Sequence, residues 1–234
     1  MTVDTVPLAA AVERTRTGDL WVFRGRSVAD RLIQTLTNSP VNHVGIAVVL
    51  EDMPPLMWHA EMGRALPDVW TGKKQRGVQL HVLADAVRQW TGPYGQRAWF
   101  RQLSPEVGTE HEDALLQSIA RLNGVSFPSA GRLTARWARG RWSSARGAQR
   151  DTRTQNPGAP GETVPKGGGN RLEAAYCAEV VGATLESMGI LLPAGDTSWY
   201  DPGRFWSGDA LPLAPGWDYG REISVTVTPA GSPD

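Results

Sequence analysis

Four side chains of this 234-residue chain could together form a catalytic thiol site: Cys177, His43, His59 and Glu61. Cys177 is the only cysteine, so it can form neither an internal disulfide nor a cysteine-based metal site. A cysteine that is more than a small buried hydrophobe is a candidate nucleophile, and a nucleophile needs a base. The histidines are the candidate bases, and the polar group beside the base would fix its tautomer.

The segment 176–181 is predicted to be the point where a loop becomes a helix. Backbone N–H groups and the macrodipole at a helix start lower the pKa of a thiol, which would favour the thiolate of Cys177. The same N–H groups could stabilise an oxyanion. Tyr176 and Asn42 are the candidate residues for shaping this oxyanion and substrate region, although core packing explains Tyr176 equally well.

Two strand-like segments carry the candidate bases. Side chains alternate between the faces of a strand, so His43 shares a face with Gly45, and His59 shares a face with Glu61. If the two strands pair, His43 lies within hydrogen-bond reach of His59 or Glu61, and both remain candidates for the third role. A helix that brings Cys177 to that face would complete a thiol, an imidazole and an orienting group.

The elements that must position these residues indicate an α+β fold in a single domain, 1–234, with a small, mostly antiparallel sheet packed against helices. Apolar and β-branched runs predict strands at 20–23, 41–50, 56–62, 78–83, 98–103 and 222–228. Helices are predicted at 27–36 and 84–90, from a capping box at Thr109 and Glu112, and from Cys177 onward. The stretch 140–171, rich in Arg, Gly, Ser, Thr and Pro, is predicted to be a flexible insertion.

Composition limits the partners. Apolar residues make up 41% and charged residues 21%, which is typical of a packed globular core. The formal net charge is +0, so no global field draws nucleic acid or an anionic membrane. No apolar run is long enough to span a membrane, no secretory signal is visible, and we therefore expect a cytoplasmic protein. The oligomeric state is left open.

Several of these motifs, in this order, resemble the circularly permuted papain-like cysteine hydrolases, and within them the YiiX-like amidase group, which is related to NlpC-type peptidases. The motifs are Gly18-Asp19-Leu20, Asn42-His43-Val44-Gly45-Ile46, Trp58-His59-Ala60 and Tyr176-Cys177-Ala178-Glu179. The resemblance covers about Gly18 to Gly189, with 140–171 unmatched. It implies a permuted papain-like fold, His43 as base and Cys177 as nucleophile, with the third position at His59 and Glu61 nearby.

The function predicted from these residues is a cysteine hydrolase that cleaves an amide bond of a small peptide-like substrate through an acyl-enzyme thioester. An acyltransferase or ester hydrolase with the same residues, or a non-catalytic binding module, are the alternatives. A zinc site on His43, His59 and Glu61 is chemically adequate. Its spacing matches no recognised ligand pattern and it leaves Cys177 unexplained, so we expect no metal and no cofactor. His81 and His111 are expected to be structural or exposed.

Overall fold

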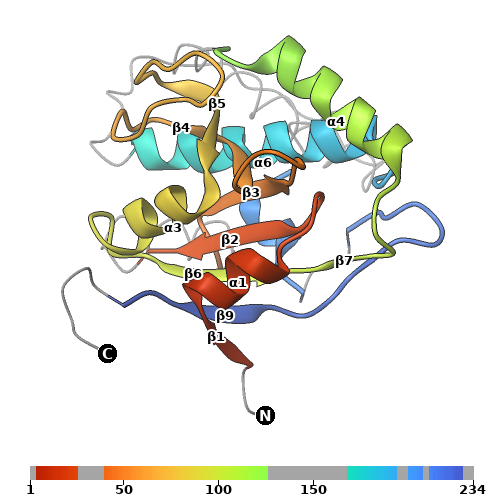
Figure 1. Ribbon diagram of the computed structural model, residues 1–234, viewed down its shortest axis with the longest axis horizontal. Coiled ribbons are helices and arrows are strands. Elements are labelled where there is room, and N and C mark those ends of the chain that lie inside the picture. Colours follow the sequence, from red (N-terminus) through yellow and green to blue (C-terminus); the bar gives the residue numbers. More distant parts are fainter. Residues whose placement is uncertain (1–3, 26–39, 126–167, 194–199, 208–210, 229–234) are drawn as a thin grey trace, which may run out of the picture.

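A computed structural model of the protein describes residues 4–25, 40–125, 168–193, 200–207 and 211–228. Its centre is a 7-stranded sheet in the order β1-β9-β6-β2-β3-β4-β5 (Figure 1). The strands are β1 (Thr5–Pro7), β2 (Leu20–Arg24), β3 (His43–Val48), β4 (Leu56–Glu61), β5 (Gly77–Val82), β6 (Arg97–Arg101) and β9 (Ile223–Thr226). Neighbouring strands are antiparallel except β1 and β9, which are parallel.

The other described elements surround this sheet. The helices are α1 (Leu8–Arg14), α3 (Leu83–Thr91), α4 (Thr109–Leu122), α6 (Gly168–Ser187) and the 3-10 helix η2 (Pro202–Phe205). Two short strands, β7 (Leu103–Ser104) and β8 (Asp218–Tyr219), form a separate antiparallel pair. The α+β prediction with a mostly antiparallel sheet is therefore confirmed.

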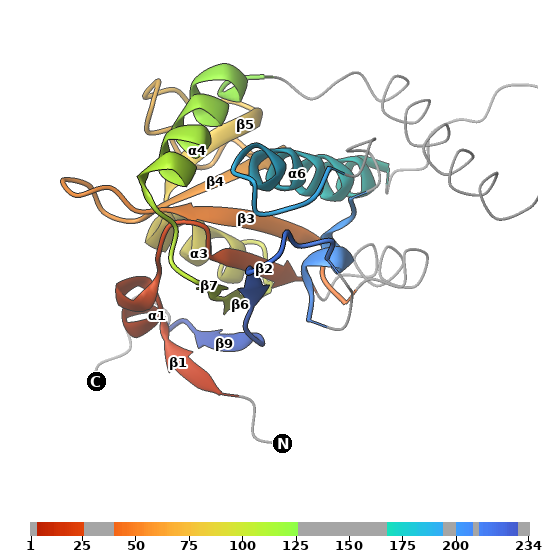
Figure 2. The same ribbon diagram turned by 90° about the vertical axis from the view of Figure 1, so that its right-hand side faces the viewer.

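Helices cover both faces of the sheet, with α6 and α3 on opposite sides of β3 (Figure 2). The face toward α6 is apolar, and one polar link crosses it, from Trp58 Nε1 to Thr184 Oγ1 at 3.1 Å. Its core includes Leu20, Val22, Val44, Ile46, Trp58, Cys177, Val181 and Leu185. The face toward α3 has a second core, formed by Trp21, Phe23, Ala47, Met57, Leu83, Val87, Trp90 and Phe100.

Most predicted elements are present, with three corrections. The N-cap of α4 is Gly108, whose N–H donates to His111 Nδ1 at 3.3 Å, so Thr109 is the first helical residue rather than the cap. We expected the last strand, 222–228, at an edge of the sheet, but β9 lies between β1 and β6. The N-terminal β1 and α1 were not predicted. The helix predicted at 27–36 lies outside the described residues.

The helix that carries Cys177 begins earlier than predicted. α6 starts at Gly168, so Cys177 lies in the middle of a 20-residue helix rather than at its N-terminus. Most of the predicted insertion, 140–171, lies outside the described residues, and its last residues belong to the first turn of α6. None of the described helices is both long enough and apolar enough to cross a membrane.

Candidate functional site

Three imidazoles form a continuous hydrogen-bonded chain on the face of the sheet toward α3. His43 Nε2 lies 2.9 Å from His59 Nδ1, and His59 Nε2 lies 2.9 Å from His81 Nδ1. Register explains the chain, because Met57 pairs with His81 across β4 and β5 and alternation places His59 on the same face as Met57. The prediction that His43 comes within hydrogen-bond reach of His59 is confirmed.

Aromatic and small residues fix the position of these rings. Trp90 of α3 stacks on His43 with ring centroids 3.8 Å apart and 16° between planes. Gly45 leaves the room that His59 needs, because a Cβ at that position would lie 2.8 Å from Met57 Cγ and 3.3 Å from His59 Cβ. The rings are thus held by close packing, which limits their freedom to rotate.

Glu61 lies at the His81 end of the chain. Its Oε2 is 3.7 Å from His81 Nδ1 and 4.0 Å from His59 Nε2. Its Oε1 accepts a hydrogen bond of 2.9 Å from the Tyr94 hydroxyl. A Cβ at Gly63 would overlap both Glu61 Oε1 and Tyr94 Oη, so a glycine there allows this contact. Tyr94 is 38% exposed and connects the buried group to the surface.

Burial sets the charge state of the site. It lowers the pKa of His43 to about 3 and that of His81 to about 4, and it holds the pKa of His59 well below its usual range. Burial also raises the pKa of Glu61, and the Tyr94 hydrogen bond opposes that shift. The three imidazoles are therefore neutral at neutral pH, and each offers one nitrogen lone pair.

Unsatisfied polar atoms gather on this face. His43 Nδ1, His81 Nε2 and both side-chain polar atoms of Gln79 are buried and have no hydrogen-bond partner among the described residues. Gln79 lies directly across from His59 in the β4–β5 register. Buried polar groups without partners are uncommon and costly, and they concentrate where a protein holds something other than its own chain.

His59, Glu61 and His81 offer a donor set that could hold a metal ion. Given separations of 2.9, 3.7 and 4.0 Å between their facing atoms, a point equidistant from all three lies about 2.1 Å from each, the length of a Zn–N or Zn–O bond. Two imidazoles and one carboxylate suit Zn²⁺ or Fe²⁺. This arrangement differs from the zinc set rejected above, because His81 takes the place of His43.

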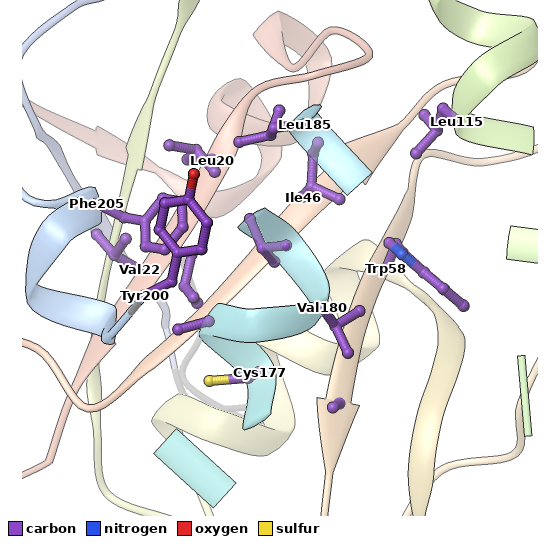
Figure 3. Close-up of a cluster of buried hydrophobic side chains, with 14 of the residues drawn as sticks. Leu20, Val22, Ile46, Trp58, Leu115, Cys177, Val180, Leu185, Tyr200 and Phe205 are labelled. Carbon is purple, nitrogen blue, oxygen red and sulfur yellow. The ribbon is translucent and has the colours of Figure 1, made fainter. Parts of the chain in front are cut away.

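Cys177 is on the other side of the sheet. Its side chain is fully buried on α6 within the apolar cluster that Figure 3 shows. His43 points to the α3 face, where its Nε2 bonds to His59, and its Nδ1 has no partner in the described part of the chain. No hydrogen bond therefore joins His43 to Cys177, and the predicted pairing is wrong. The helix-start argument for a low thiol pKa also fails, because that effect fades within the first turn.

The two residues predicted to shape an oxyanion site, Tyr176 and Asn42, have packing and hydrogen-bonding roles in the structure. Tyr176 lies on α6 in the same apolar cluster as Cys177 and is 7% exposed. Asn42 Oδ1 accepts a hydrogen bond of 3.1 Å from the Gly25 backbone and so ties the end of β2 to the start of β3. An oxyanion role for either residue stays a prediction.

The functional residue that sequence reasoning missed is His81. It was expected to be structural or exposed, but it lies inside β5, which runs to Val82, and its ring is buried beside His59. The signal was present: Val78, Leu80 and Val82 alternate with Gln79 and His81, which places both polar residues on one face.

Comparison with known proteins gives weak likenesses. No protein-family model matches the chain, and no curated protein matches it. Among solved structures, the crystal structure of metalloprotein yiiX from Escherichia coli O157:H7 (DUF1105) is similar, with a TM-score of 0.35 and 20% identity. The match covers 50% of this chain and 55% of that chain, so it spans about half of each. This neighbour is a YiiX protein, the group that the motifs resemble, while the permuted papain-like fold and the NlpC relation stay predictions.

Proposed function

We propose that this protein is a metalloprotein that holds one divalent transition-metal ion, such as Zn²⁺, on His59 Nε2, His81 Nδ1 and Glu61 Oε2. The observation that carries the proposal is the position of three donor atoms around one point at bonding distance, in a buried site. The carboxylate would offset part of the charge of the cation, and the neutral imidazoles would donate their lone pairs.

The neighbours of the donor set fit the role of outer-shell partners. A histidine that binds a metal usually donates its other ring N–H to a fixed acceptor. Here His59 Nδ1–H would donate to His43 Nε2, 2.9 Å away. Tyr94 donates to Glu61 Oε1 and leaves Oε2 for the metal. His43 and Tyr94 are therefore positioning residues in this proposal.

A cation at this point would require one particular tautomer of each ring, because the distances between the rings do not fix where the protons lie. With the proton of His59 on Nδ1 and that of His81 on Nε2, the two remaining lone pairs face each other across 2.9 Å. Two facing lone pairs repel unless a proton or a cation lies between them. The metal would take the place of the His59–His81 hydrogen bond, and because the imidazoles are already neutral at neutral pH, their protonation would weaken binding only in acid.

Burial indicates that the ion would contribute to folding. The donor side chains are at most 2% exposed, so the ion would be bound in the protein interior by side chains from two neighbouring strands. An unfolded chain rarely preserves such a site, so binding free energy becomes folding free energy.

The test is the metal content of the purified chain. The protein, equilibrated with excess Zn²⁺ and then desalted, should retain one zinc per chain by elemental mass spectrometry. His81→Gln should retain none, and His111→Gln is the matched control because His111 lies outside the array, on α4 beside Trp217. Equal zinc content in the wild type and His81→Gln, or no zinc in the wild type, would contradict the proposal.

A thiol hydrolase acting on a small peptide-like amide or an acyl substrate is the second candidate. The observation that favours it is the His43–His59 hydrogen bond, which is the base and orienting pair the sequence predicted. This function also requires the sulfur of Cys177 to reach the face that carries His43. Alkylation by iodoacetamide distinguishes the two: rapid reaction that His43→Ala slows supports the hydrolase, and reaction far slower than that of N-acetylcysteine in both proteins opposes it.

A further inference from the structure

The connection between β4 and β5, residues 62–76, concentrates exposed positive charge; we call it the Trp70 loop. Arg64, Lys73, Lys74 and Arg76 are all exposed, and the loop holds two of the three lysines in the chain. None of these four side chains forms an ion pair within the described part of the protein. Because the whole chain has a net charge of +0, this positive patch is local.

The single acidic residue of the loop forms no ion pair with these cations among the described residues. Asp68 is fully buried, and its carboxylate accepts hydrogen bonds from the Thr71 backbone at 2.8 Å, the Leu80 backbone at 2.8 Å and Asn123 Nδ2 at 3.1 Å. These bonds fasten the base of the loop to β5 and to the end of α4. The exposed cations are thus held on an ordered support.

Trp70 stands out from this support. Its side chain is 59% exposed, the largest exposure among the large hydrophobic residues that the structure describes. The turn is closed by hydrogen bonds from Gly72 N to Asp68 O at 2.8 Å and from Asp68 N to Lys73 O at 3.0 Å, and Gly72 adopts φ of 68°. The indole is therefore exposed in the connection that leads into β5, an edge strand of the sheet, a few residues before the exposed Lys73 and Lys74.

We infer that the Trp70 loop binds an anionic phospholipid surface. An indole sits favourably at the boundary between headgroups and acyl chains, and Lys and Arg beside it attract anionic headgroups. A single exposed aromatic in a short turn, with basic residues before and after it in the sequence, fits a flat interface. A single-stranded nucleic acid would instead need a groove with several stacking aromatics. The inference is independent of the metal proposal, because no residue of the metal site belongs to the loop.

Sedimentation with vesicles tests the inference on the full chain. Binding to phosphatidylcholine vesicles containing about 30% phosphatidylserine should exceed binding to pure phosphatidylcholine at 100 mM NaCl and should fall at 500 mM, since salt screens such attraction. Each basic residue near an anionic surface contributes about fivefold, so the double variant Lys73→Gln/Lys74→Gln should bind roughly 25-fold more weakly. Trp70→Ala should weaken binding about tenfold.

Matched controls separate the loop from general charge and hydrophobicity. Arg97→Gln/Arg221→Gln removes the same charge from exposed positions at the β6–β9 side of the sheet, and Leu192→Ala removes another exposed apolar side chain (48% exposed). Both controls should bind like the wild type. The inference would be overturned if binding did not depend on phosphatidylserine, or if the loop variants bound vesicles as well as the wild type. It would also be overturned if the loop variants lost binding to an oligonucleotide but kept binding to vesicles.

Discussion

The two faces of the central sheet carry different kinds of side chain on the same strands. On β3, Val44 and Ile46 point toward α6 into an apolar cluster, while His43 points toward α3 and opens the imidazole chain. All six residues of β3 are buried, so its sequence resembles a uniform core strand. The difference shows that a buried strand can carry a polar site on one face only when the other face supplies the apolar burial.

The two faces also differ in their energetic roles. The α6 face excludes water from apolar side chains, the main source of stability. The α3 face contains buried nitrogen and oxygen atoms that no described protein group pairs with, and a buried polar group left without any partner costs about 1–3 kcal/mol. The α3 face also has an apolar core of its own, so these polar atoms reduce the stability that this face contributes rather than cancel it.

The largest expected effect is on metal affinity. His59→Ala removes a donor and leaves His43 and His81 without their shared partner, so zinc affinity should fall by more than the roughly 100-fold loss that an outer-shell change can cause. Competition with a chromogenic chelator measures this. Ile46→Ala, on the opposite face, is the control and should keep its zinc affinity; loss of affinity in Ile46→Ala alone would reverse the assignment of the two faces.

Acid should destabilise the metal-free protein through the α3 face. Burial lowers the pKa of all three imidazoles below 6.5, so the unfolded chain binds more protons than the folded one as the pH falls. The contribution of the neutral imidazoles to the free energy of unfolding is therefore present in full above pH 6.5 and is lost in acid. Each imidazole contributes about 1.4 kcal/mol per pH unit below 6.5. Burial also raises the pKa of Glu61, and it raises the pKa of Asp19 to about 6; both shifts act in the opposite direction.

Urea unfolding of the chelator-treated protein at pH 7.5 and pH 5.5 measures this balance. We expect lower stability at pH 5.5, because three imidazoles outweigh two carboxyls, and a smaller difference in His81→Gln. Stability that rises over the same interval would contradict the burial of neutral imidazoles.

The α6 face should respond to loss of volume. Ile46 is fully buried between Leu20 and Trp58 on the neighbouring strands, so Ile46→Ala should lower the free energy of unfolding by about 2–5 kcal/mol. Thermal and urea unfolding measure the change. A loss below about 1 kcal/mol would show that this face is not the close-packed one.

Tyr94→Phe should produce a smaller effect on the α3 face. It removes the hydrogen bond to Glu61 Oε1 and preserves the ring, so zinc affinity should fall by about 10–100-fold with little loss of stability. The same chelator competition measures it. An unchanged affinity would mean that the carboxylate needs no outer-shell partner.

Cys177→Ala should have the smallest effect. Cys177 is fully buried in the α6 cluster, on the face opposite the proposed metal donors, so its truncation should cost about 1 kcal/mol of stability and leave zinc affinity unchanged. Calorimetric unfolding and zinc titration check both quantities. Loss of zinc binding in this variant would place the cysteine among the ligands.

Sequence patterns predicted where the strands lie and which side chains share a face of a strand. Alternation and β-branched content located β2 to β6 and brought His43, His59 and Glu61 to one face. Alternation does not say which helix covers that face, and the helix of Cys177 covers the other one. The start of α6 was also missed, because the glycines at 167–169 favour a loop. In the structure α6 packs on β3 and β4, and such packing overrides local propensity.

X-ray absorption at the zinc edge of the 1:1 complex tests the central claim most directly. The account predicts nitrogen and oxygen neighbours at about 2.0–2.2 Å, with the multiple-scattering signature of two imidazoles and no sulfur. A zinc–sulfur distance of about 2.3 Å, or a first shell without imidazole, would contradict the assignment of the metal to the α3 face.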